Sequence, residues 1–155
     1  MTGSRRYAVG LSEVALPVAE VERSVTFYTE VVALELERRG EAFAFLWAGE
    51  PGRRQRVILL SRDLPPLEDR PRSRSTPEPP PALALLRPGL LGPTHFALEV
   101  PADEIEAAVA HVGAKGVEVW GPVDFGWFGS GHYFLDPDGH WVEFWTPPQR
   151  EKDDG

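Results

Sequence analysis

The sequence contains no cysteine. This absence excludes disulfide bonds and thiolate-bound zinc, and it favours a reducing compartment, so we expect a cytoplasmic protein. There is also no apolar run near the ~20 residues that span a bilayer, and the N-terminus lacks the apolar core of a secretory signal. We therefore expect no membrane partner.

Basic residues are scarce. Lysine and arginine number 16 against 24 acidic residues, which gives a net charge of -8. Nucleic-acid binding requires a basic face, so we expect no nucleic-acid partner. The 155 residues, 42% hydrophobic and 26% charged, suit one domain or two small fused units. Without cysteine, any metal ion must be bound by His, Asp or Glu.

Proline is plentiful, but it concentrates in one segment. Residues 63–92 are poor in apolar side chains and rich in Pro, Ser, Arg and Glu, which predicts no packed structure. We interpret this segment as an extended linker, with a flap over a binding site as the alternative. The expected organisation is a leader (1–10), a first module (11–62), the linker (63–92), a second module (93–148) and a tail (149–155).

The first module has the pattern strand, helix and three strands. Alternation predicts a first strand over 11–18, in which Pro17 indicates an edge strand because proline cannot donate a hydrogen bond. An apolar stripe with helical spacing then predicts a helix over 20–32. Three strands follow, at 34–37, 43–47 and 57–60.

The second module repeats this pattern. The segment THFALEV at 94–100 echoes SEVALPV at 12–18. Residues 103–112 are predicted to form a helix that Gly113 caps, and residues 117–120 a strand. We infer an internal repeat of a βαβββ unit, and we expect an α+β fold in which the two modules pair into a curved mixed sheet around a shared cleft.

The end of the second module predicts a hairpin. Tyr133 to Leu135 lead into the turn Asp-Pro-Asp-Gly at 136–139, and Trp141 to Trp145 form the return strand. Alternation places Glu143 on the same face as two tryptophans. Burying this carboxylate is costly without a partner, so either that face is wet or something positive pairs with Glu143.

The repeat brings metal-ligand side chains to matching positions. It aligns Glu13 with His95 and Ile58 with Glu143, and all four are expected to face the shared interior. One imidazole and two carboxylates suit a divalent ion such as Zn²⁺, Mn²⁺, Fe²⁺ or Ni²⁺. We therefore predict one divalent metal ion bound by Glu13, His95 and Glu143. If no metal binds, His95 and Glu143 pair directly.

Three segments carry a family resemblance: EVALPVAEVERSVTFYTEVVALEL at 13–36, HFALEV at 95–100 and YFLDPDGHWVEFW at 133–145. In them the chain resembles the vicinal oxygen chelate superfamily, which includes glyoxalase I, fosfomycin-resistance proteins, bleomycin-binding proteins and extradiol dioxygenases. The resemblance implies metal ligands at the positions of Glu13, Ile58, His95 and Glu143. Ile58 departs from the four-ligand pattern of glyoxalase I, and Ala33 replaces the glycine that usually closes the first helix.

The resemblance implies several functions. A divalent-metal-dependent enzyme that acts on a small oxygen-chelating substrate is expected first. Lyase or isomerase chemistry ranks above an extradiol dioxygenase, because Glu13 replaces the first of the two histidines in the non-haem iron set. The alternative is a metal-free drug-binding protein of the bleomycin-resistance type. The superfamily also suggests a homodimer.

Tyr133 is expected beside Glu143, either as a hydrogen-bond donor or general acid, as its position in fosfomycin-resistance proteins implies, or as one more core aromatic. Glu13 and Glu143 are the candidate general bases. His132 should point away from the interior. The remaining lining residues predict a substrate with an apolar or aromatic portion; they are Phe45, Trp47, Ile58, Leu60, Trp141 and Trp145.

Overall fold

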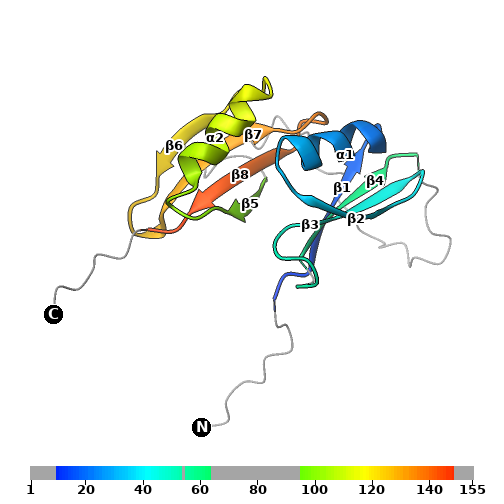
Figure 1. Cartoon of the computed structure of the whole chain (residues 1–155), viewed down its shortest axis with the longest axis horizontal. Helices are drawn as coiled ribbons and strands as arrows, with labels where there is room; N and C mark the ends of the chain where they lie inside the picture. The colour runs from blue at the N-terminus through cyan, green and yellow to red at the C-terminus, as the bar shows by residue number, and fades with distance from the viewer. Residues whose placement is uncertain (1–9, 54, 64–94, 149–155) are drawn as a thin grey trace, which may run out of the picture. The chain divides into compact units, whose positions relative to one another are not determined.

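The protein is described here by a computed structural model that covers residues 10–53, 55–63 and 95–148. The chain divides into two compact units, Met1–Arg62 and Asp63–Gly155. Within the described residues, each unit contains a four-stranded mixed sheet and one α-helix, and Figure 1 shows each helix with its sheet. The fold is therefore α+β with two βαβββ modules, as the internal repeat predicts.

In the first unit, the helix packs on one face of the sheet. The strand order is β1-β4-β3-β2, in which the edge strand β1 runs parallel to β4 and the other neighbours are antiparallel. Pro17 lies in this edge strand, as predicted. The elements are β1 (Glu13–Val18), α1 (Val21–Glu30), β2 (Glu35–Arg39), β3 (Phe43–Trp47) and β4 (Arg56–Ser61).

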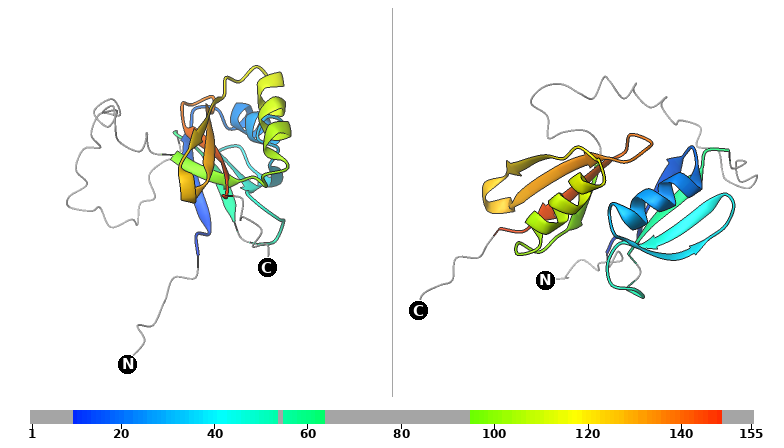
Figure 2. Two further views of the ribbon diagram at one scale, coloured as in Figure 1. Left: turned by 90° about the vertical axis from the view of Figure 1, so that its left-hand side faces the viewer. Right: turned by 45° about the horizontal axis from the view of Figure 1, so that its top comes forward.

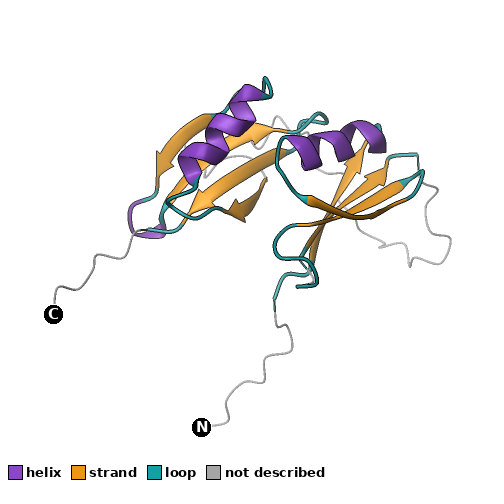
Figure 3. Ribbon diagram, in the orientation of Figure 1, coloured by secondary structure: helices purple, strands orange, loops and turns teal. Residues whose placement is uncertain are grey.

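The apolar stripe of α1 forms much of this unit's core. Val21, Val25 and Tyr28 are buried, as their helical spacing predicts. They pack with side chains from alternate positions of the strands, of which Leu46 and Leu59 are completely buried. Figure 3 shows α1 lying across its sheet.

The second unit repeats the topology. Its strand order is β5-β8-β7-β6, with β5 parallel to β8. Figure 2 shows its helix beside the strands of the same unit. The elements are β5 (His95–Glu99), α2 (Ile105–Ala114), β6 (Trp120–Asp124), the short 3₁₀-helix η2 (Gly126–Phe128), β7 (Ser130–Leu135) and β8 (Trp141–Thr146).

Two predicted elements of the second unit were misplaced. The predicted cap Gly113 lies inside α2, and Gly116 has the positive φ of 81° that follows the helix. The predicted strand at 117–120 is instead β6, which begins at Trp120. Glycine and proline at 121 and 122 indicated a loop, but β6 is an edge strand whose pairing shifts register there, and an edge position tolerates proline.

The predicted turn between β7 and β8 is confirmed. Gly139 has a φ of 85°, which is a conformation that glycine adopts without strain. The Asp136 side chain accepts hydrogen bonds from the backbone N–H groups of Asp138 and His140, at 2.9 Å and 2.8 Å. This turn fixes the register that places Tyr133 opposite Glu143.

The residues outside the description include most of the predicted leader, linker and tail. The predictions for 1–9, 64–94 and 149–155 fall there. Among the helices that the structure describes, none has the length and apolar composition needed to cross a bilayer. The pairing of the two modules around a shared cleft stays a prediction.

Candidate functional site

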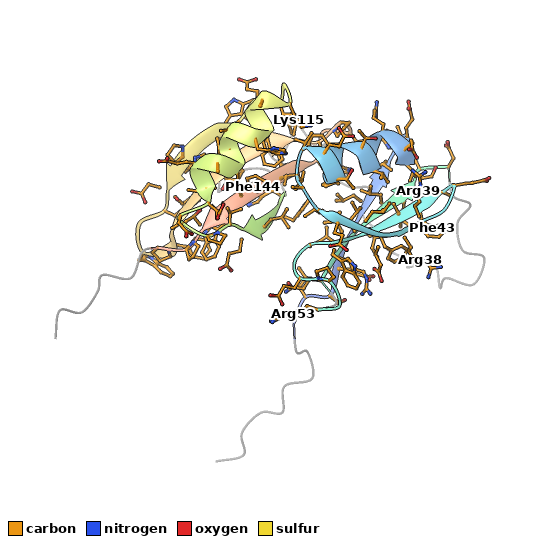
Figure 4. All side chains as sticks on the ribbon, viewed as in Figure 1. Arg38, Arg39, Phe43, Arg53, Lys115 and Phe144 are labelled. Atoms are coloured by element: carbon orange, nitrogen blue, oxygen red, sulfur yellow. The ribbon has the colours of Figure 1, made fainter. Side chains whose placement is uncertain are left out.

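The two faces of β8 have different surroundings. Val142 and Phe144 are buried on one face, and Figure 4 labels Phe144 on this strand beside α2. Trp141, Glu143 and Trp145 alternate with them and lie on the opposite face. The predicted alternation is correct, and it directs Glu143 away from the apolar core.

Glu143 is nevertheless buried, with 4% of its surface exposed. Its Oε1 atom accepts a hydrogen bond of 3.0 Å from the Tyr133 hydroxyl. Its Oε2 atom lies 2.9 Å from Nε2 of His95. The structure thus brings together three of the residues predicted in this unit's site, and two of them are the partners that the buried carboxylate requires.

The strand register explains this meeting. Tyr133 on β7 lies directly opposite Glu143 on β8. On the other side, β8 pairs with β5, where Ala97 lies opposite Glu143 and His95 is two residues earlier on the same face. The imidazole and the phenol therefore approach the carboxylate from two neighbouring strands, and their rings meet edge to face at 5.4 Å.

Burial changes the acidity of Tyr133. Removal from water raises its pKa to about 12, and the hydrogen bond to the Glu143 carboxylate acts in the same direction. The phenol consequently keeps its proton at neutral pH. Tyr133 is suited to donating a hydrogen bond and is a weak acid rather than a base.

Gly131 is a site residue that sequence reasoning missed. A Cβ atom built on it would lie 2.1 Å from Oε1 of Glu143 and 3.2 Å from the Tyr133 hydroxyl. The carboxylate therefore occupies the space that a side chain on β7 would fill. The available signal was a glycine inside a strand, which often marks close approach by another group.

Aromatic rings flank the carboxylate on both sides. The ring centroid of Trp141 lies 6.5 Å from that of Tyr133 and 5.2 Å from that of Trp120. Trp120 was not predicted to lie at the site. Trp145 packs on Phe128 of η2 at 5.5 Å, and its indole N–H donates to the Phe128 carbonyl at 3.1 Å. This face can hold a planar apolar group beside a hydrogen-bonding centre.

His132 points the other way, as predicted. It pairs with Phe144 across the strands, which places it on the face opposite Glu143. Burial lowers its pKa, because the charged imidazolium loses hydration. Its Nδ1 atom is buried and has no hydrogen-bond partner among the described residues. His132 is a structural residue.

The remaining predicted residues lie in the first unit. Glu13 is exposed at the start of β1, and Ile58 on β4 is buried. Phe45 lies directly opposite Ile58, and Leu60 and Trp47 occupy the same strand faces two residues away. These apolar positions share a face with Glu13. Glu13 pairs with Arg56, and alternate residues of β4 after Arg56 lie on the same face of the sheet.

Arg56 changes the electrostatics of this face. Its guanidinium donates to both carboxylate oxygens of Glu37 and lies 4.3 Å from the centroid of the Trp47 ring. The pKa of Arg56 is raised by the hydrogen bond to Glu37 and further by the nearby charge of Glu13. Trp47 thus stacks on a cation from its own sheet, which sequence reasoning did not predict.

The strand registers confirm the internal alignment. β1 and β4 pair Glu13 with Arg56, as β5 and β8 pair His95 with Trp141. The next pair on the same face contains Ile58 in one unit and Glu143 in the other. The position that holds a carboxylate in the second unit is therefore filled by an isoleucine in the first.

The donor set of the second unit fits part of a metal site. Divalent ions lie ~2.0–2.2 Å from imidazole nitrogen and carboxylate oxygen, so adjacent ligands lie roughly 3.0–3.4 Å apart, depending on the coordination angle. The 2.9 Å between His95 Nε2 and Glu143 Oε2 is the distance of a direct pair, as expected without a metal, and it also places both atoms close enough to bind one ion. In the described ranges, no three His, Asp or Glu side chains gather at one point.

A separate groove of about 690 Å³ lies in the first unit at the start of α1. None of the predicted site residues lines it. The Arg39–Glu22 ion pair forms part of its wall, and both side chains are largely exposed. The groove therefore lacks the buried polar centre that the Glu143 face has.

Comparison with known proteins identifies the family. The model described as "Glyoxalase/Bleomycin resistance protein/Dioxygenase superfamily" matches residues 10–144. The chain belongs to this superfamily, as its sequence segments indicate. The two four-stranded mixed sheets agree with the vicinal oxygen chelate fold.

Individual relatives have different functions. The chain is 28% identical over 138 residues to the glutathione transferase FosA of Serratia marcescens, covering 86% of this chain and 77% of that one. It resembles the lactoylglutathione lyase of Agrobacterium tumefaciens (22% identity, TM-score 0.63, covering 91% and 96%). It also resembles TnmS3, an antibiotic-binding protein from Streptomyces sp. CB03234 (22%, TM-score 0.58, covering 93% and 100%).

Proposed function

We propose that the protein is a divalent-metal-dependent enzyme that acts on a small oxygen-chelating substrate at the Glu143 face. The observation that carries this proposal is the 2.9 Å approach of His95 Nε2 to Glu143 Oε2. A neutral imidazole and a carboxylate at that spacing are suited to binding one ion of Zn²⁺, Mn²⁺, Ni²⁺ or Fe²⁺.

In this proposal Glu13 supplies the third ligand. The assignment rests on the internal repeat, in which Glu13 occupies the His95 position of the first module. A bound divalent ion polarises neighbouring substrate oxygens and stabilises negative charge that develops on them. The position of Ile58 supplies no ligand, so it leaves a place for water or substrate.

The chain's own residues would orient the substrate and move a proton. Tyr133 keeps its proton at neutral pH and can donate a hydrogen bond to a substrate oxygen. Glu13 or Glu143 is the candidate base. The rings of Trp141 and Trp145 favour a substrate with an apolar or aromatic portion.

The ligand set favours lyase or isomerase chemistry over oxygen activation. Non-haem iron oxygenases use two histidines and one carboxylate. The proposed set has one histidine, His95, and two carboxylates. An extradiol-type dioxygenase is therefore the less favoured enzyme class.

Metal analysis of the purified protein tests this proposal. We expect one divalent ion per chain and a rise in melting temperature with Mn²⁺, Zn²⁺, Ni²⁺ or Fe²⁺, because a ligand that binds only the folded state stabilises it. Glu143→Ala should abolish both effects, whereas Glu106→Ala on the exposed side of α2 should preserve them. If the parent protein contains no stoichiometric metal and shows no rise in melting temperature with these ions, the proposal of a metal-dependent enzyme is excluded.

A metal-free small-molecule-binding protein is the second candidate. The supporting observation is that His95 and Tyr133 already contact both oxygens of Glu143. Such a protein would bind a planar aromatic compound between the tryptophans and show tryptophan quenching that chelators do not change. Quenching that disappears with EDTA would instead favour the metal-dependent enzyme.

We further propose that the protein works as a cytoplasmic homodimer. The absence of cysteine supports a reducing compartment. The superfamily pairs its modules either within one chain or across a dimer, and light scattering after size-exclusion chromatography measures whether the protein is a monomer or a dimer. A mass near 17.2 kDa in solution would exclude the dimer.

A further inference from the structure

Gly131 lies in the interior of β7, where glycine is unfavourable. Its φ is not in the left-handed region, so the backbone does not require glycine. Its flexibility therefore does not explain its presence. The reason must lie in the space beside it.

That space contains the Glu143 carboxylate. A Cβ atom on residue 131 would lie 2.1 Å from Oε1 and 3.0 Å from Cδ of Glu143. The first distance is far inside van der Waals contact, and the second is shorter than ordinary contact. An alanine at this position therefore requires the carboxylate to move.

The carboxylate has little freedom to move. The Tyr133 hydroxyl contacts one oxygen at 3.0 Å, and His95 lies 2.9 Å from the other. A methyl group on residue 131 would also lie 3.2 Å from the Tyr133 hydroxyl. Displacing Glu143 breaks contacts that satisfy a buried charge, which is costly.

We propose that Gly131 is a positioning residue, whose missing side chain allows the Glu143 carboxylate to lie over β7 between His95 and Tyr133. Its effect on ligand binding rests on the proposed function of Glu143. Its steric coupling to Glu143 does not depend on that function, so the steric coupling and the effect on ligand binding can fail separately.

A double-mutant cycle tests the coupling through stability alone. Gly131→Ala should lower the urea midpoint in the parent background and have little effect in the Glu143→Ala background, where the oxygen is gone. An equal loss in both backgrounds would show that residue 131 does not act through Glu143. This readout needs neither metal nor substrate.

A rescue variant and a matched control sharpen the cycle. Adding Glu143→Asp to Gly131→Ala shortens the side chain by one methylene, so it should restore part of the lost urea midpoint. Gly113→Ala is the control, because no atom lies within 4 Å of its Cβ position and its helical site favours alanine. Absence of rescue by aspartate would overturn the positioning role.

Titration with Mn²⁺ alone extends the test to the proposed site. Gly131→Ala should weaken Mn²⁺ binding at least tenfold, and Gly113→Ala should leave it unchanged. Unchanged affinity in Gly131→Ala would overturn the positioning role in ligand binding. If the parent protein binds none of Mn²⁺, Zn²⁺, Ni²⁺ and Fe²⁺, the metal-dependent enzyme fails, and the stability cycle alone decides whether Gly131 positions Glu143.

Discussion

At the scale of single residues, Ala33 carries strain that a glycine would relieve. It has a φ of 63°, where an L-residue costs ~1–2 kcal/mol, and this conformation allows the Leu34 N–H to donate to the Tyr28 carbonyl after α1. The Ala33 side chain is exposed, so its removal leaves no cavity. Glycine also increases the conformational entropy of the unfolded chain, which offsets this relief of strain by ~0.4–1 kcal/mol.

Ala33→Gly should therefore raise the free energy of unfolding by about 0.5–1 kcal/mol. Urea unfolding measures this change. The matched control is Ala114→Gly at the end of α2, where alanine has no positive φ and glycine should destabilise by about 0.5–1 kcal/mol. A loss of stability in both variants would show that Ala33 is not strained.

His132 should make stability depend on pH. Burial lowers its folded-state pKa below the ordinary value of 6.5. The unfolded state therefore binds a proton first as the pH falls below about 6.5, and stability decreases until the folded-state pKa is passed. Above that range the residue is neutral in both states and contributes no dependence.

Replacing this imidazole tests its part in the pH dependence. His132→Phe should reduce the stability difference between pH 7.5 and pH 5, measured by urea unfolding. His111→Gln, on an exposed position of α2, should retain the difference. Equal pH profiles for the parent protein and His132→Phe would contradict the assignment.

At the scale of elements, the β7–β8 turn depends on one side chain. Asp136 is buried and accepts two backbone hydrogen bonds, from Asp138 and His140. Asp136→Ala should cost about 1–3 kcal/mol in unfolding free energy, since the donors lose their acceptor. Asp136→Asn keeps one acceptor oxygen and should cost less. An equal loss for both variants would show that the acceptor is not what matters.

Elements with clear periodicity were predictable from the sequence, and elements that depend on partners were not. β3 was predicted at its observed bounds, because it is a short continuous apolar run that a glycine- and arginine-rich turn at 49–54 follows. β6 was misplaced because Gly121 and Pro122 resemble a loop, whereas an irregular pairing with β7 accommodates them. Gly113 was predicted to cap α2, but the helix continues to Ala114 and the positive φ lies at Gly116.

At the scale of the whole molecule, the two units have cores of different size. Among the described residues, thirteen of the buried apolar side chains lie in the first unit and four in the second. Apolar burial is the main stabilising contribution to folding. The four in the second unit are Val112, Phe134, Val142 and Phe144.

We expect the second unit to open at a lower free energy than the first. Native-state hydrogen exchange should show weaker protection of the backbone amides in β7 and β8 than in β3 and β4. Val57→Ala and Val142→Ala, at matching positions of the repeat, should each lower protection mainly within their own unit. Equal protection of the two sheets would contradict this expectation.

The sequence by itself determined the repeat, the hairpin and the face on which Glu143 lies. These features follow from local alternation, turn residues and similarity between the two halves. It also indicated His95 and Tyr133 as neighbours of Glu143, because the repeat and the hairpin fix their strand positions. Glu13 as a third ligand stays a prediction.

Only the tertiary structure decided which atoms meet. The hydrogen bond from Tyr133, the approach of His95 and the space above Gly131 depend on the register of three strands and on side-chain volume. No local pattern encodes such distances, since β5 is separated from β8 by α2, β6 and β7. The Glu143 carboxylate, which the sequence shows without a partner, has two partners in the folded unit and lies in the space that Gly131 leaves open.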